Sequence, residues 1–256
     1  IQGIEDTALK DINREDVKIT VKVFISSPDV NLLKEAIDQV CNSLNINAIE
    51  SLVIAYLSKE NPEELLASLK HLWTGVEEYV KIGKLSSVGL SDVNTNMFID
   101  LFQWANIKPN IVQISLATCC VVPPALQTFS KENDIQLLTH NDPGQILPEE
   151  DLNGIFNANT NLYWVTRYQI HLKCRGILSS KGYLVYVSKK TKKNRFIYWS
   201  MKKQSVKCVN VGLNSNYTLA EDHFVKSTIL FCRVRLNRIL QSGGTKQIRG
   251  PASSKY

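Results

Sequence analysis

The residues that could carry chemistry in this chain include four histidines and six cysteines, and their spacings exclude several common sites. No histidine has a metal-ligand partner four residues away, and no Ser/His/Asp arrangement can be recognised. No CxxC pair suggests zinc, and neither a GxGxxG nor a Walker loop follows a strand-like run. We therefore expect no metal site and no bound cofactor.

One histidine stands at a position where chemistry is conceivable. His140 follows an apolar run and lies beside Asn141 and Asp142. If the strands of this chain close into a barrel, the ends of those strands form the catalytic face. A histidine at a strand end is more often a capping or loop group than a base, so both roles stay open.

Cys119 and Cys120 form the most unusual pair in the sequence. Adjacent residues have Cα atoms about 3.8 Å apart, whereas a disulfide prefers about 4.4 to 6.8 Å. We therefore expect no bond between the two. In a strand-like stretch their side chains point to opposite faces, so that one thiol packs inward and the other is available to a partner. The alternative is that both are buried as small apolar groups.

The segment around these cysteines has the pattern strand, helix, strand. Residues 111–116 are apolar and rich in β-branched types, Pro123 and Pro124 can open a helix, and residues 135–138 form a second apolar run. Turn-forming residues at 140–144 end that run. This pattern is typical of two parallel strands joined by a helix.

The rest of the chain before His140 repeats this alternation. Strands are expected at residues 17–26, 51–57 and 83–89, and helices at about 32–44, 62–81 and 97–104. Such an order predicts a parallel sheet covered by helices, either doubly wound or closed into a barrel. Further strand-like runs lie at residues 163–172 and 177–187, and residues 180–182 are interpreted as a turn between two strands.

Charge divides the chain into two parts. The net charge is +6, but residues 189–256 contain 15 Lys or Arg and only 2 Asp or Glu. We interpret residues 1–188 as the folded domain and residues 189–256 as a basic, poorly ordered extension. The extension has too few interleaved aromatic residues to predict nucleic-acid binding.

The sequence gives no indication of a membrane protein. No apolar run approaches the roughly 18 residues of a membrane span. The acidic and mixed segment at residues 1–16 does not resemble a signal peptide. We therefore expect a cytoplasmic protein with reduced thiols.

Two motifs resemble the aldo-keto reductase superfamily. GKLSSVGLSD at residues 83–92 is similar to a strand that ends in Gly-Val-Ser-Asn, and KPNIVQ at residues 108–113 is similar to the Lys-Pro-x-x-x-Gln strand that follows it. The resemblance implies an α/β fold, an aldo-keto-reductase-like (β/α)₈ TIM barrel. Because the family carries a long segment before the first strand seen here, we expect that the first barrel unit is missing from this chain.

A narrower resemblance covers residues 13–186. The strings at residues 117–124, 134–143 and 175–183 are similar to those of glutamate–cysteine ligase regulatory (modifier) subunits, which are aldo-keto-reductase-like proteins. This implies a non-catalytic protein that forms a heterodimer with the catalytic subunit of the ligase, improves its use of glutamate and lessens feedback inhibition by glutathione. The alternative is an NADPH-dependent aldo-keto reductase with weak or residual activity.

The resemblance also assigns candidate site residues. Lys22 matches the lysine that, in reductases, lowers the pKa of a catalytic tyrosine, and Ser91 and Gln113 match residues that bind the nicotinamide carboxamide. We expect all three to be vestigial, because the strand for the tyrosine and its partner aspartate lies upstream, Ser58 stands near the histidine position, and Asp92 replaces an asparagine.

The partner implied by the resemblance gives the cysteines a possible role. A redox-sensitive disulfide between the subunits would form from Cys119, Cys120 or Cys174. Because cytosolic disulfides are usually transient, such a link would be dynamic.

Overall fold

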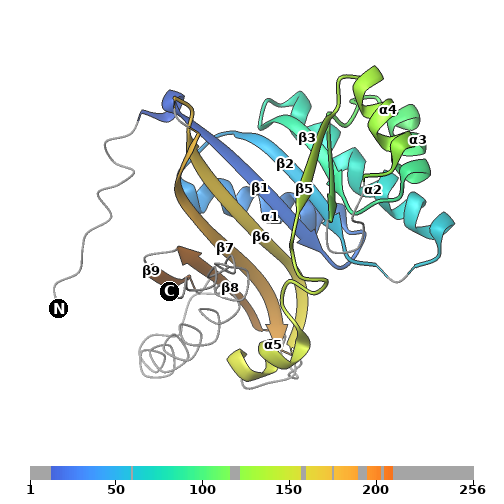
Figure 1. Ribbon diagram of the computed structural model, residues 1–256. Coiled ribbons are helices and arrows are strands. Elements are labelled where there is room, and N and C mark those ends of the chain that lie inside the picture. The colour runs from blue at the N-terminus through green and yellow to red at the C-terminus, as the bar shows by residue number, and fades with distance from the viewer. Residues whose placement is uncertain are drawn as a thin grey trace, which may run out of the picture.

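The computed structural model describes residues 13–58, 60–115, 122–156, 160–174, 176–189, 195–202 and 205–209 (Figure 1). In this part of the chain, strands and helices alternate up to β5, and strands alone follow α5. The helical elements are η1 (Arg14–Asp16), α1 (Val30–Leu44), α2 (Pro62–Lys81), α3 (Thr95–Trp104), α4 (Pro124–Glu132) and α5 (Glu149–Phe156). The strands are β1 (Val17–Ile25), β2 (Ile49–Tyr56), β3 (Leu85–Ser91), β4 (Ile111–Ser115), β5 (Gln136–His140), β6 (Thr160–Leu172), β7 (Ile177–Lys189), β8 (Arg195–Lys202) and β9 (Ser205–Val209).

All nine strands belong to one sheet in the order β5-β4-β3-β2-β1-β6-β7-β8-β9. The first five are parallel and alternate with helices, which confirms the predicted α/β fold. The strands from β6 onward pair antiparallel, β6 with β1 on one edge and with β7 on the other, followed by β8 and β9. β1 is therefore the strand at which the parallel and antiparallel halves meet.

The helices begin where the sequence supplies side chains that cap free N–H groups. Asn61 accepts a hydrogen bond from the backbone of Glu64 at 2.9 Å, and Pro62 occupies the first turn of α2. Asn94 caps α3 in the same way, by accepting from the backbone N–H of Met97 at 2.8 Å. These local signals explain why the predicted helices agree closely with the observed ones.

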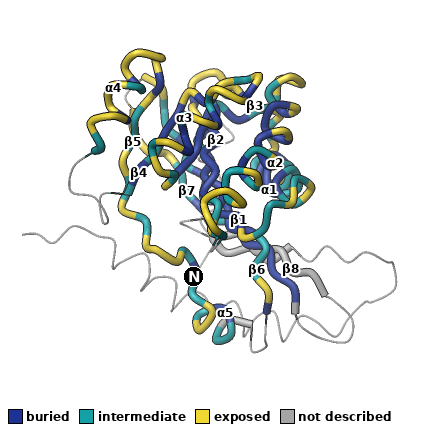
Figure 2. Tube along the Cα trace, turned by 90° about the vertical axis from the view of Figure 1, so that its right-hand side faces the viewer, coloured by how far each residue is buried: buried dark blue, intermediate teal, exposed yellow. Residues whose placement is uncertain are grey.

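The sheet has two faces with different covers. Alternate strand residues such as Val23 and Trp164 belong to the main core beneath the helices α1–α4. Their neighbours Phe24 and Val165 belong to a second, smaller cluster, which the segment around Leu147 and α5 covers. Figure 2 shows that buried residues are concentrated in the central strands, whereas α4 is largely exposed. We call the face of Phe24 and Val165 the inner face.

Two sequence-based interpretations differ from the structure. Residues 180–182 do not form a turn but lie inside β7, where Gly182 pairs with Tyr168. The chain turns earlier, between β6 and β7, and there Gly176 adopts a φ of 61°, which suits a residue without a side chain. A hairpin that turns at this position places both expected strands in one antiparallel pair.

The sheet also extends beyond the predicted domain boundary at residue 188. β7 ends at Lys189, and β8 and β9 continue the sheet from residue 195 to residue 209. The basic charge of this segment indicates poor order, but β8 contains an unbroken apolar and aromatic run of Phe196, Ile197, Tyr198 and Trp199. Residues 210–256 of the predicted extension lie outside the described part of the chain.

Candidate functional site

The candidate site is built around Lys22, on the inner face of β1. Its side chain is only 4% exposed, and its ammonium lies 5.1 Å from the centre of the Phe24 ring. Nζ donates to Ser91 Oγ and to Asp142 Oδ2, both at 2.8 Å. The structure therefore brings Lys22 and Ser91 together and adds an aspartate from beyond β5.

Asp142 also pairs with Arg167 of β6. Arg167 Nη1 donates to Asp142 Oδ1, and Nη2 donates to Oδ2 at 3.2 Å. Lys22 and Arg167 are register partners in the β1–β6 ladder, so both side chains leave the sheet on the same face. One carboxylate thus joins two cations from neighbouring strands.

Burial and pairing together shift the pKa values of these groups. Burial lowers the pKa of Lys22, and the hydrogen bond and charge of Asp142 offset this only in part. Burial raises the pKa of Asp142, but the hydrogen bonds and charges of Arg167 and Lys22 outweigh it, so that this pKa lies below its ordinary value. Burial lowers the pKa of Arg167, but the hydrogen bond and charge of Asp142 outweigh burial, so that this pKa lies above its ordinary value. Asp142 and Arg167 are both ionised at neutral pH.

A second set of contacts links Asp92 and His140 to the same network. His140 Nε2 lies 2.8 and 2.9 Å from the two carboxylate oxygens of Asp92, and Ser91 Oγ donates to Asp92 Oδ2 at 2.8 Å. Because the backbone N–H of Asp142 donates to His140 Nδ1 at 3.1 Å, the ring proton is assigned to Nε2. His140 thus accepts a bond from the Asp142 turn and also donates to Asp92.

Asp92 adopts a backbone conformation that residues with side chains seldom use. Its φ is 60°, directly after the last residue of β3. Such residues persist when surrounding contacts hold them, and they concentrate at functional sites. Here the bonds from Ser91 and His140 hold the carboxylate at the mouth of the network, with 43% of the side chain exposed.

Gln113 lies on β4 opposite Ser91, but it does not join the network. Within the described residues, its buried Oε1 has no hydrogen-bond partner. A nicotinamide carboxamide needs donors as well as acceptors. Gln113 carries both an acceptor oxygen and an NH₂ donor, and the Asp92 carboxylate can accept from an amide NH₂ group, so these two residues match a carboxamide in hydrogen-bond type. The Ser91 hydroxyl is already engaged with Lys22 and Asp92, and we derive no chemistry through a nicotinamide cofactor.

The predicted cysteine positions are only partly described. Cys174 lies in the turn between β6 and β7 and is an exposed free thiol. Cys119 and Cys120 lie outside the described residues. The role of all three therefore stays a prediction.

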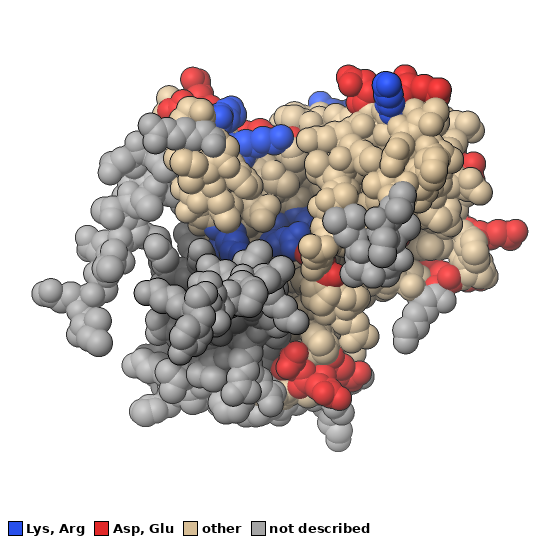
Figure 3. Space-filling model, in the orientation of Figure 1, with Lys and Arg blue, Asp and Glu red and all other residues tan. Residues whose placement is uncertain are grey.

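Figure 3 shows the molecule in the orientation of Figure 1. Basic side chains lie at the floor of a hollow near the centre, and acidic side chains gather over α5, whose first turn contains Glu149, Glu150 and Asp151. Acidic residues at a helix N-terminus interact favourably with the helix dipole. This local effect accounts for the acidic patch.

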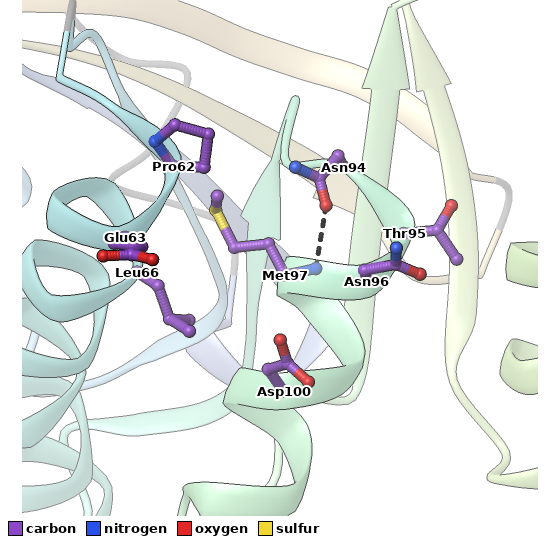
Figure 4. A pocket seen from close by; sticks show the side chains of 8 residues that line it. All are labelled: Pro62, Glu63, Leu66, Asn94, Thr95, Asn96, Met97 and Asp100. Carbon is purple, nitrogen blue, oxygen red and sulfur yellow. Dashed lines mark hydrogen bonds between the residues drawn. The ribbon is translucent and has the colours of Figure 1, made fainter.

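A separate cavity of about 420 Å³ opens where α2 and α3 begin. Figure 4 shows the Asn94 side chain turned toward the backbone nitrogen of Met97 at its edge. Its lining consists of Pro62, Glu63, Leu66, Asn94, Thr95, Asn96, Met97 and Asp100. The lining does not include a residue of the Lys22 network.

Within the described residues, no group of three or more His, Cys, Asp or Glu side chains could hold a metal ion. Across the same residues, no helix is long and apolar enough to cross a membrane.

Comparison with known proteins gives a consistent set of relatives. The chain is 37% identical over 189 residues to the glutamate–cysteine ligase regulatory subunits of Rattus norvegicus and Homo sapiens, a match that covers 69% of this chain and 68% of each relative. It is 24% identical over 208 residues to a putative glutamate–cysteine ligase regulatory subunit of Schizosaccharomyces pombe. No family model matches the chain.

The similar solved structures include aldo-keto reductases. An aldose reductase from Giardia lamblia has a TM-score of 0.42 and 21% identity, and the match covers 52% of this chain and 48% of that protein. An aldo-keto reductase from Brucella melitensis has a TM-score of 0.42 and 19% identity, with coverage of 50% and 47%. The chain thus spans about half the length of these structures.

Proposed function

Because the chain belongs to the family of glutamate–cysteine ligase regulatory subunits, we propose that it binds the catalytic subunit of that ligase and regulates it. The observation that carries this proposal is the 37% identity to the mammalian regulatory subunits over 69% of the chain. The partnership itself is inferred from the name of those relatives.

The regulation we propose is better use of glutamate and weaker inhibition by glutathione. A binding partner can change an enzyme in this way only if it binds one state of the enzyme more tightly than another. We propose that the chain binds the glutamate-competent state of the catalytic subunit preferentially. By thermodynamic linkage, glutamate would then strengthen the association of the two chains.

The geometry of the Lys22 network is consistent with a role that needs no catalytic group. Lys22 is nearly inaccessible, and its ammonium is bonded to Ser91 and Asp142 of the same chain. A general acid or base must lie within hydrogen-bond reach of a substrate. These groups instead bond to one another.

The test is the activity of the catalytic subunit at limiting glutamate, with and without this chain, repeated in the presence of glutathione. We expect higher activity and relief of inhibition, both saturating with the concentration of the chain. The same amount of an unrelated protein of similar size is the control. If the chain forms a complex with the catalytic subunit but changes neither property, the regulatory proposal is refuted.

A second candidate function is NADPH-dependent carbonyl reduction. The contact between Lys22 and Ser91 favours it, because the resemblance places both residues at a reductase active site. Titration with NADPH, followed by tryptophan fluorescence and by NADPH absorbance with a carbonyl substrate, separates the two functions. Neither quenching nor oxidation is expected if the chain is only a regulatory subunit.

We also propose that an intersubunit disulfide forms under oxidation, through Cys119, Cys120 or Cys174. The exposure of Cys174 supports it as a candidate. Non-reducing gels of the oxidised complex should show a band at the summed mass of the two chains. Serine variants at each position would identify the thiol, and the absence of the band in the unaltered complex would exclude the link.

A further inference from the structure

The two cations of the network are fixed by the sheet, whereas their shared anion is not. Lys22 and Arg167 face each other across the β1–β6 ladder, and Ser91 bonds to Lys22 Nζ from β3. Asp142 lies two residues beyond the end of β5, in the segment that leads to α5. The sheet thus supplies the two cations, and the segment between β5 and α5 supplies the carboxylate that binds them.

The contacts of Asp142 are those of a bound carboxylate ligand. Both of its oxygens accept from Arg167, and one of them also accepts from Lys22. A guanidinium group matches the two oxygens of a carboxylate in a planar fork, and an ammonium adds a point charge. The Asp142 side chain is 9% exposed, so water competes little for these bonds.

We infer that Lys22 and Arg167 form a carboxylate-binding site, and that Asp142 occupies it from within the chain. The charges favour a monoanion. Lys22 and Arg167 contribute two positive charges, and Asp92, at 3.9 Å from Lys22 Nζ, already compensates one of them in part. A small monocarboxylate brings the net charge of the site close to zero, whereas a phosphate dianion would make it negative.

Occupation by Asp142 and occupation by a free carboxylate exclude each other. The segment that follows Asp142 lies over the inner face, where Leu147 and Leu152 pack in the cluster of Phe24. Asp142 is therefore held beside the cations at a high effective concentration. A free carboxylate can enter only when the Asp142 side chain is removed or withdrawn.

Chemical rescue of Asp142→Ala tests the site. The substitution deletes a carboxylate group of the size of formate and leaves two neighbouring cations without their shared partner. We expect the thermal midpoint of the full chain to fall by about 10 °C. Formate should recover about half of that loss, because a ligand that binds only the folded state raises its stability. Sodium chloride at the same ionic strength should not.

The controls vary the size of the added carboxylate and the position of the substitution. Propionate, which is larger than the deleted group, should rescue less than formate. Glu149→Ala removes an exposed carboxylate from α5, and neither it nor the unaltered chain should respond to formate beyond chloride. Replacing Arg167 by Met in the Asp142→Ala background should abolish the response.

If Asp142→Ala does not fold in chloride, the recovery of folded protein on dilution from urea into formate replaces the thermal midpoint as the measurement. Equal effects of formate and chloride would refute the site. So would a formate response that persists without Arg167.

Discussion

Glu77 of α2 is a buried carboxylate outside the Lys22 network, and its removal should be costly. Its side chain accepts hydrogen bonds from the backbone N–H groups of Asn106 at 2.7 Å and Ile107 at 3.0 Å, and from Asn106 Nδ2 at 3.2 Å. The residue is 5% exposed. These bonds hold the loop between α3 and β4 against α2.

Glu77→Gln preserves the shape of the side chain but removes the charge and one acceptor. An amide oxygen can replace one acceptor oxygen, so at least one N–H group is left without its partner. An unsatisfied buried group costs about 1–3 kcal/mol, and bonds to a charged group are worth about 1.5–3 kcal/mol each. We expect the free energy of unfolding to fall by about 3 kcal/mol.

Urea unfolding followed by tryptophan fluorescence measures this loss, and the adjacent residue supplies a matched control. Glu78 is 59% exposed and pairs with Lys34, so Glu78→Gln should cost less than about 0.5 kcal/mol. At a slope of about 3 kcal/mol per molar urea, Glu77→Gln should lower the unfolding midpoint by about 1 M. Equal midpoints for the two variants would refute the reasoning.

The pKa of Glu77 gives the same prediction a pH dependence. Burial raises this pKa, but the bonds from Ile107 and Asn106 outweigh burial, so that it lies below the ordinary value of 4.5. The contribution of the carboxylate is therefore complete above that value and is lost as the pH falls through the lower pKa of the folded state. The stability difference between the unaltered chain and Glu77→Gln should narrow below about pH 4.5, and a widening would contradict the assignment.

Three further substitutions, with one control, test the packing, a helix cap and a buried hydrogen bond. Gly89→Ala would place a Cβ 2.0 Å from the backbone oxygen of Ile111, so the free energy of unfolding measured in urea should fall by about 3 kcal/mol or more. The control is Gly144→Ala, which should be nearly neutral because the space around Gly144 is open. Asn94→Ala removes the cap of α3 and should cost about 1 kcal/mol in the same assay. Tyr79→Phe removes a 2.8 Å hydrogen bond to an aspartate of α1 and should also cost about 1 kcal/mol, read from the thermal midpoint.

The parallel half of the fold could be predicted from the sequence because each of its signals is local. Apolar strand runs, asparagine caps and turn-forming residues each extend over a few positions, and the elements from β1 to β5 follow them. The direction of β6 and β7 depends instead on the short turn at residues 173–176, which the Ser180-Lys181-Gly182 pattern obscured. β8 and β9 are not predicted, because the positive charge of that segment indicates poor order and masks the short apolar run in β8.

The candidate site was predictable only where a motif marks it. Lys22, Ser91 and Gln113 could be selected by resemblance, although Gln113 does not join the network. Arg167 and Asp142 could not be recognised as partners, since they come from an antiparallel strand and from a turn. The turn-forming types around His140 explain why Asp142 was interpreted as structural, and only the register of β1 against β6 shows what it contacts.

The position of β1 between the two halves of the sheet has a consequence during synthesis. β2 follows β1 closely in the chain and can pair with one of its edges early, but the other edge pairs with β6, beginning at Thr160. At a synthesis rate of about 5–20 residues per second, that edge stays without its strand for roughly 7–30 s after β1 has been made. An unpaired, apolar central strand is a template for wrong pairing. The edge of β1 that faces β6 is therefore most exposed to wrong pairing in the interval before β6 is complete.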